Sequence, residues 1–173
     1  MRRAKDIMGL PVLDIEAGKQ LGTAKDFLID RDWNLQGVLL ESKNWFASPR
    51  YIGWEDIVSI GTDAVTVKDE QAVRSMDDSG SEWVALLDGG FKLKGLPVIT
   101  LDGENLGLVE DVYFGEKMDK KIVGYELSDG FISDIKEGRK WLPSPQSATI
   151  GEDAVMVPVG CVAQETPSFH EIG

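Results

Sequence analysis

The chain has 173 residues, and 18 basic against 30 acidic side chains give it a formal net charge of −12. This length fits one domain or two small ones. Hydrophobic residues (42%) and charged residues (28%) occur near the averages of soluble globular proteins, which excludes disorder over the whole chain. The negative charge argues against direct nucleic-acid binding and against adsorption to anionic membranes, since both need clustered positive charge.

Two further features of the sequence predict a cytoplasmic protein without membrane insertion. No uninterrupted apolar run approaches the roughly 20 residues that cross a bilayer, and the basic N-terminus lacks the apolar stretch of a secretory signal. Cys161 is the single cysteine, so it cannot form an internal disulfide or supply a cysteine-rich zinc site.

An internal repeat organises the chain. Three motifs occur twice and in the same order: Gly-Leu-Pro-Val at 9–12 and 95–98, Gly-x-x-Leu-Gly at 18–22 and 103–107, and Ile-Gly-x-Asp-Ala-Val-x-Val at 60–67 and 150–157. Asp26 and Asp111 match within the same order. Because order and spacing are kept, the pattern indicates a tandem duplication.

Each copy is predicted to be β. Odd-numbered residues from 21 to 29 would share one face of a strand, and even-numbered residues the other. Glycine-containing turns at 16–18 and 102–103 predict hairpins. Further strands are expected at 35–41, 50–54 and 64–68, and in the second copy at 106–114, 121–127, 139–143 and 154–159. Such short strands suggest a small barrel closed by its own pairing, and we expect the two barrels to pack on each other or on a partner.

One short helix is expected between the copies, over residues 81–89. Ser81 would begin it, apolar residues form its middle, and Gly89 would end it. The polar stretch before it is typical of a linker. The predicted organisation is a first domain at 1–75, a linker with a short helix at 76–90, a second domain at 91–160 and a C-terminal tail at 161–173.

The repeated motifs resemble the PRC-barrel domain, a small β-barrel of the photosynthetic reaction centre H subunit and of the ribosome maturation factor. Gly-Leu-Pro-Val, Leu-Gly-x-x-x-Asp and Ile-Gly-x-Asp-Ala-Val-x-Val carry the resemblance in both copies. It implies an all-β protein of two tandem small PRC-type β-barrels with a short connecting helix, used as a docking module. The family's apolar residue and Pro before the closing strand occur in the second copy as Leu142-Pro143, whereas the first copy has Ile52-Gly53.

The residues that could carry catalysis have simpler interpretations. His170, the single histidine, lies near the C-terminus, and Cys161 lacks a basic partner in the sequence. Asp26 and Asp111 are expected to accept hydrogen bonds from the amides of nearby turns. We therefore expect no enzyme activity, no catalytic residue and no cofactor.

One segment has the ligand spacing of a calcium loop. Asp30, Asp32 and Asn34 are followed by Glu41, but Leu35 occupies the sixth position, where the bend of the loop requires Gly. A hairpin turn rich in Asp and Asn explains the same residues. We expect a turn and no metal.

Apolar residues in two predicted loops are candidates for binding a partner: Trp45 and Phe46 in the first copy, and Phe131 and Ile132 in the second. Loops on a rigid barrel often carry function, and Trp and Phe are common interface anchors. The same side chains could instead cover the mouth of the barrel or pack between the two copies.

The predicted function is a non-enzymatic adaptor that binds a protein partner of unknown identity. Homo-oligomers are compatible with the sequence. The alternative is a ribosome- or RNA-processing-associated factor that docks on a basic ribosomal protein. This alternative rests on the resemblance to the maturation factor alone.

Overall fold

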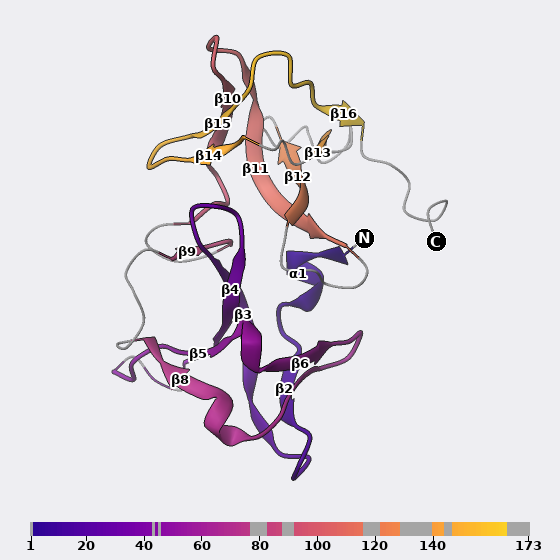
Figure 1. Ribbon diagram of the computed structural model, residues 1–173, viewed down its shortest axis with the longest axis vertical. Coiled ribbons are helices and arrows are strands. Elements are labelled where there is room, and N and C mark those ends of the chain that lie inside the picture. The colour runs from indigo at the N-terminus through magenta and orange to yellow at the C-terminus, as the bar shows by residue number, and fades with distance from the viewer. Residues whose placement is uncertain are drawn as a thin grey trace.

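The computed structural model describes residues 2–42, 44, 46–76, 83–87, 92–115, 122–128, 140–143 and 147–165. Figure 1 shows the two repeats stacked along the long axis, with the first in the lower half and the second in the upper half. Each repeat forms one curled β-sheet. The predicted all-β architecture of two similar small units is therefore confirmed.

The first sheet consists of β2 (Pro11–Asp14), β3 (Gln20–Ile29), β4 (Leu35–Leu40), β5 (Arg50–Gly53), β6 (Ile57–Ile60), β7 (Val65–Val67), β8 (Val73–Ser75) and β9 (Val84–Ala85). The strand order is β6-β7-β2-β3-β4-β5-β8, with β9 beside β3. β2 and β7 pair in parallel, and the other neighbours are antiparallel. Two 3-10 turns, η1 (Trp54–Asp56) and η2 (Glu70–Ala72), lead into β6 and β8.

The second sheet repeats this arrangement strand for strand. It consists of β10 (Pro97–Thr100), β11 (Asn105–Phe114), β12 (Ile122–Ser128), β13 (Lys140–Pro143), β14 (Thr149–Ile150), β15 (Val155–Val157) and β16 (Gln164–Glu165). The order is β14-β15-β10-β11-β12-β13-β16, and the additional strand β1 (Arg2–Arg3) lies beside β11. The strands predicted from the sequence are present in both repeats.

The structure differs from the predicted barrel in how each sheet ends. The first sheet ends at β6 and β8 and the second at β14 and β16, and no pairing among the described residues joins these edges. Each sheet is therefore a curled half-barrel and not a barrel closed by its own strands.

The long central strands β3 and β11 both contain a β-bulge. The register shifts between Ala24 and Asp26 in β3, and between Val109 and Asp111 in β11. In β3 the extra residue is Lys25, and after the bulge Phe27, Leu28 and Ile29 are all buried, so the predicted alternation of faces is lost there. A bulge bends a strand and increases its twist. This bend contributes to the curl of each sheet.

The hairpins predicted before the central strands are present. Gly18 and Gly103 have φ angles of 65° and 90°, a conformation that residues with a Cβ rarely adopt. The Asp14 carboxylate accepts hydrogen bonds from the amides of Glu16 and Ala17 at 2.7 and 2.8 Å, which stabilises the first of these turns.

The segments that precede each repeat are exchanged between the repeats. β1 and the helix α1 (Ala4–Ile7) precede the first repeat, but β1 pairs with β11 of the second, with Arg3 opposite Tyr113. β9 precedes the second repeat, but it pairs with β3 of the first, with Ala85 opposite Leu28. Figure 1 shows α1 and β9 at the level where the two repeats meet. The segment that precedes the first repeat thus adds a strand to the sheet of the second, and the segment that precedes the second adds a strand to the sheet of the first.

The helix predicted over residues 81–89 is replaced by this pairing. Its described part, residues 83–87, contains β9, and the rest lies outside the described residues. The Leu86 amide donates to the Phe27 carbonyl at 3.1 Å. Pairing with β3 outweighs the local helical pattern, because tertiary contacts override propensity. The short α-helix of the described chain is α1, which precedes the first repeat.

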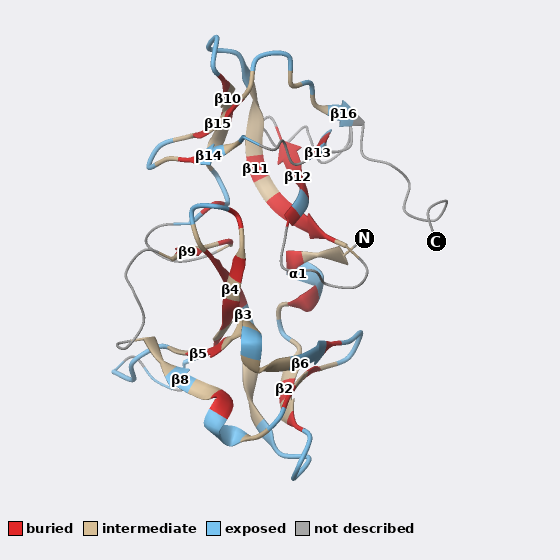
Figure 2. Cartoon of the chain, in the orientation of Figure 1, coloured by how far each residue is buried: buried red, intermediate tan, exposed pale blue. Residues whose placement is uncertain are grey.

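One hydrophobic core runs through both repeats. The ring centroids of Phe27 and Phe114 lie 4.9 Å apart, and so do those of Trp33 and Tyr125. Trp33 also donates from Nε1 to the Ala148 carbonyl at 3.0 Å. Figure 2 shows that buried residues gather on the strands and helix near the middle of the molecule, while the distal turns are exposed. The expectation that the repeats pack on each other is confirmed.

Candidate functional site

The structure describes one of the four residues predicted to bind a partner. Phe46 lies in the loop between β4 and β5 and is 97% exposed. Its amide donates to Oδ1 of Asn44 at 3.0 Å, which orders the backbone locally while the ring stays in solvent. Trp45, Phe131 and Ile132 lie outside the described residues.

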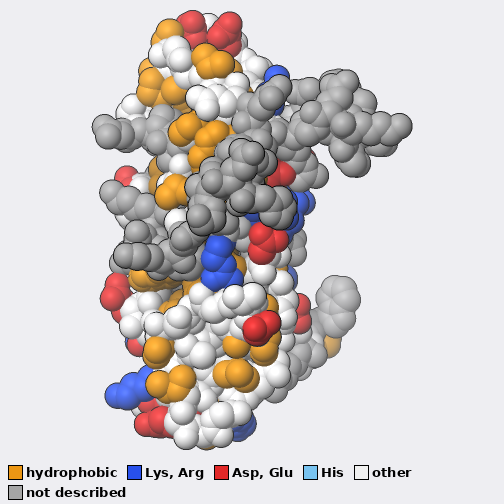
Figure 3. All heavy atoms as spheres, turned by 90° about the vertical axis from the view of Figure 1, so that its right-hand side faces the viewer, with side chains coloured by type: hydrophobic (Ala, Val, Ile, Leu, Met, Phe, Trp, Pro, Cys, Tyr) orange, Lys and Arg blue, Asp and Glu red, His pale blue; other side chains and the backbone are white. Residues whose placement is uncertain are grey.

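Other large hydrophobic residues are exposed to a smaller degree. Leu101 and Val58 are 68% and 56% exposed. On the face drawn in Figure 3, hydrophobic side chains form several groups in both halves of the molecule. Single exposed apolar side chains are common on soluble proteins. The nearly complete exposure of Phe46 is the more informative feature.

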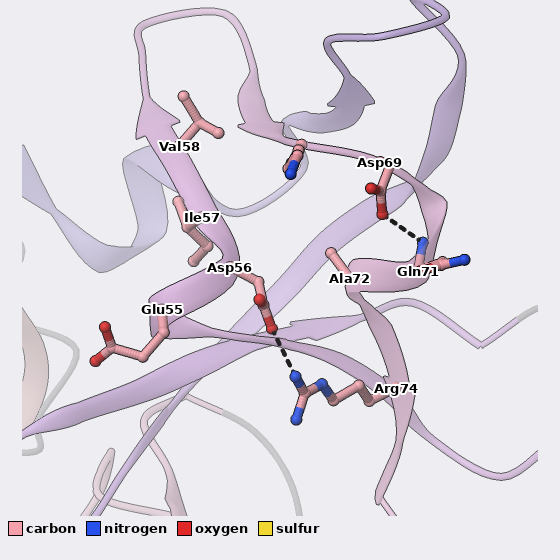
Figure 4. Close-up of a pocket in the computed structure, with 9 residues that line it drawn as sticks. Glu55, Asp56, Ile57, Val58, Asp69, Gln71, Ala72 and Arg74 are labelled. Carbon is pink, nitrogen blue, oxygen red and sulfur yellow. Dashed lines mark hydrogen bonds and ion pairs between the residues drawn. The ribbon is translucent and has the colours of Figure 1, made fainter.

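An open cleft lies between the two edge strands of the first sheet, drawn in Figure 4. η1 and β6 form one wall, and the segment from Lys68 to Arg74 forms the other. The volume of the cleft is about 420 Å³. An ion pair of 3.2 Å between Arg74 and Asp56 joins the two walls, and Asp69 accepts from the Gln71 amide at 2.9 Å.

The cleft carries charges of both signs. Its ionisable lining residues are Glu55, Asp56, Lys68, Asp69 and Arg74. The rest of the lining is apolar or amide, so the cleft offers ion pairing and hydrogen bonding but no Ser, Cys or His nucleophile. The strand register places Gln164 of the second repeat where the first has its arginine. The positive charge at this position is therefore a property of the first repeat.

Asp26 and Asp111 are fully buried and accept hydrogen bonds from backbone amides, as predicted, but the donors lie in strands and in distant segments and not in nearby turns. The Leu87 amide donates to the two carboxylate oxygens of Asp26 at 3.0 and 3.1 Å. The Lys5 amide donates to Asp111 at 3.4 Å. Both donors belong to the exchanged segments. Each carboxylate therefore holds the segment that precedes the other repeat.

Sequence reasoning missed a buried polar cluster in the second repeat. Glu126 of β12 is 3% exposed, its Oε2 accepts from the Tyr113 hydroxyl at 3.0 Å, and Arg3 lies 3.8 Å from the same oxygen. Burial raises the pKa of the Tyr113 hydroxyl, and the charge of Glu126 raises it further. The available signal was a Glu within the apolar run 122–127, where the first repeat has only Leu and Val around its Gly and Gln.

The same buried environment shifts the pKa of the Asp111 carboxyl group. Burial raises its pKa from 3.8 to about 6, and Glu126 adds to this increase. The Val112 amide, together with the charge and the amide of Lys5, lowers the pKa and so offsets part of the effect. Asp111 therefore titrates nearer to neutral pH than an exposed aspartate does.

The residues of the calcium-like motif form a hairpin turn. Oδ1 of Asp30 accepts from the amides of Asp32 and Asn34 at 2.9 and 3.0 Å, and Gln36 donates to Oδ2 at 2.7 Å. The predicted Asp-rich turn is confirmed. Glu41 follows the opposite end of β4, about 20 Å along the strand at roughly 3.3 Å per residue. The strand therefore separates Glu41 from the turn.

Of the two remaining candidates, Cys161 and His170, the structure describes Cys161. Cys161 is partly buried, and its amide donates to the Pro158 carbonyl at 3.4 Å. His170 lies outside the described residues. Within the described ranges, no group of three or more His, Cys, Asp or Glu side chains is placed to hold a metal ion. None of the helices in the described part of the chain combines the length and apolar character that a membrane-spanning helix requires.

Comparisons with known proteins agree with the two-sheet architecture. The model of the PRC-barrel domain family matches residues 1–73 and 89–160. The uncharacterized protein YrrD of Bacillus subtilis (strain 168) is 27% identical over 151 residues, which cover 85% of this chain and 81% of that protein. The matched segments contain the two repeats and leave most of the residues between them outside. The chain belongs to the PRC-barrel domain family and carries two such domains in tandem.

Proposed function

We propose that this PRC-barrel protein is a cytoplasmic, non-enzymatic protein-binding module, and that the loop carrying Phe46 is part of its binding surface. The observation that carries the proposal is the 97% exposure of Phe46. Burial of a Phe side chain contributes about 1.5–3 kcal/mol. The fold does not gain this energy, so a partner that covers the ring would gain it on binding.

The charge of the chain favours a basic or neutral partner. The net charge is −12, and like charges on a partner would oppose association. Trp45, Phe131 and Ile132 stay predicted partner-binding residues. The cleft between β6 and β8 adds Glu55 and Asp69 as exposed or half-exposed carboxylates that a basic segment could pair with.

Capture of partners from a native lysate tests the proposal. The bait is the full chain as wild type, as Phe46→Ser and as the matched control Leu101→Ser. Leu101 is also well exposed, lies in the second repeat, and undergoes the same apolar-to-polar change. We expect Phe46→Ser to lose proteins that Leu101→Ser retains. Identical protein sets for all three baits, or no specific protein for the wild type, would contradict the proposal.

Co-sedimentation with ribosomal subunits separates this proposal from the ribosome-associated alternative. An acidic chain that docks on a basic ribosomal protein should sediment with one subunit and dissociate as salt screens the attraction. Such sedimentation, if Phe46→Ser leaves it unchanged, would favour the alternative and remove the loop from the binding surface.

A further inference from the structure

The N-terminal segment, residues 2–8, is short and contacts both repeats. β1 adds two residues to the side of β11, and Ala4 and Ile7 are the buried residues of α1. Arg2 reaches the first repeat, where it donates to the Ile60 carbonyl at 2.7 Å. A helix of one turn is unstable without tertiary contacts. Detachment of this segment would leave the other strand pairs of both sheets in place.

This contact encloses several ionisable groups. Asp111 and Glu126 are both buried on the side of the second repeat that the N-terminal segment covers. Among the described residues, the ionisable groups that act on Asp111 are Lys5 of the N-terminal segment, Glu126 of β12 and Tyr113 of β11. Arg3 and Asp6 of the same segment lie next to them, because Arg3 is 3.8 Å from Glu126 and 3.3 Å from Asp6. β10, the other neighbour of β11, has no ionisable side chain. Arg3 also pairs with Asp6 at 3.3 Å, so its charge is shared between carboxylates.

Among the described residues, the equivalent strand positions of the first repeat are apolar. There, Leu28 and Leu39 occupy the positions of the tyrosine and the glutamate. The buried aspartate Asp26 accepts from the Leu87 amide at 3.0 and 3.1 Å, shorter than the 3.4 Å bond that Asp111 accepts. The two exchanged segments therefore differ in chemistry although their strand pairing is the same. The linker segment, residues 83–87, serves as an internal control.

We propose that the N-terminal segment is a proton-sensitive closure of the second repeat: it is held when Asp111 carries a proton and detaches more often when Asp111 is ionised. Burial makes the carboxylate of Asp111 costly to ionise, the charge and the amide of Lys5 offset part of this cost, and detachment returns the carboxylate to water. The proton leaves to solvent. The open state would expose the outer side of β11 near Tyr113. The proposal is independent of partner binding at Phe46.

The pKa of Asp111 supports the direction of this effect. Burial raises the pKa to about 6, and detachment would return it toward 3.8. A carboxyl group whose pKa is higher in the closed state favours closure at low pH, and this advantage is lost as the pH rises from 3.8 through about 6. Between pH 5 and pH 7.5, the equilibrium constant for detachment should therefore rise about tenfold.

Amide hydrogen exchange in the full chain tests the proposal, because protection factors report local opening. The amide of Met8, which donates to the Ala4 carbonyl at 3.3 Å, reports on the N-terminal segment. The amide of Leu86, which donates to the Phe27 carbonyl, reports on the linker segment. After correction for intrinsic exchange, we expect protection of Met8 to fall about tenfold between pH 5 and pH 7.5. Protection of Leu86 should stay constant.

Two variants test whether the pH dependence of Met8 protection comes from the carboxyl group of Asp111. Asp111→Asn should abolish the pH dependence of Met8 protection, whereas the matched change Asp26→Asn should preserve it. Equal loss of protection at Met8 and Leu86 in the wild type would overturn the proposal, since it would indicate opening of the whole fold. Persistence of the pH dependence in Asp111→Asn would also overturn it. If that variant does not fold, the comparison of Met8 with Leu86 in the wild type decides the question.

Discussion

Replacement of Gly37 by Ala should destabilise the fold far more than the same change at Gly53, its partner on β5. A Cβ at Gly37 would lie within 2.4 Å of the Ile52 carbonyl oxygen, and this neighbour is backbone that cannot rotate away. β4 and β5 would have to separate locally. Overpacking costs about 1–3 kcal/mol, and each lost hydrogen bond of the pair adds about 1 kcal/mol. We expect a loss of about 3 kcal/mol or more.

The control at Gly53 has room for a methyl group. Its Cβ would lie 3.6 Å from the Asp56 carboxylate, and its φ of −66° and ψ of 148° suit any residue. The change to Ala there should be neutral or stabilise by about 0.4–1 kcal/mol. Urea unfolding followed by Trp fluorescence measures both variants. The reasoning is refuted if Gly37→Ala and Gly53→Ala have the same free energy of unfolding.

The remaining predictions concern the second repeat and the core. Gly124→Ala should also destabilise the fold, because the Cβ would lie 2.3 Å from the ring of Trp141, and urea unfolding checks it. Phe114→Ala should lower the free energy of unfolding by about 3–5 kcal/mol, and a loss below 1 kcal/mol would contradict its place in the shared core. Asp111→Asn should gain stability relative to the wild type between pH 4 and pH 7, by up to about 3 kcal/mol, because ionisation of the buried wild-type carboxyl is unfavourable. An unchanged difference across this pH range would contradict the raised pKa of Asp111.

Much of the fold could be predicted because the repeat supplies the same information twice. Strand positions followed from alternation and from the turn residues, and Gly18 and Gly103 adopt the positive φ that such turns need. The backbone role of Asp26 and Asp111 was also predicted correctly. The strands and turns depend on local sequence, in which side-chain period and turn chemistry act over a few residues. The amides of Leu87 and Lys5 that the two aspartates bind come from distant segments, and local sequence does not identify them.

The features that could not be predicted depend on contacts between distant segments. The apolar residues near Val84 fit a helix locally, but they form a strand because β3 offers a pairing edge. The exchange of segments between repeats has no local signature, because it is decided by which β-strand is within reach. Glu126 was missed for a related reason: its neighbours predicted a buried strand, and only the fold brings Arg3 and Tyr113 to the same carboxylate.

The reciprocal exchange is tested most directly by backbone nuclear Overhauser effects in the unmodified chain. Opposed residues of an antiparallel pair have Cα atoms about 4.5–5.5 Å apart, which brings their backbone protons within range. Cross-strand effects should connect Arg3 with Tyr113 and Ala85 with Leu28. Effects that connect Arg3 with Leu28 and Ala85 with Tyr113 instead would show that each segment pairs with its own repeat, and would contradict the exchange.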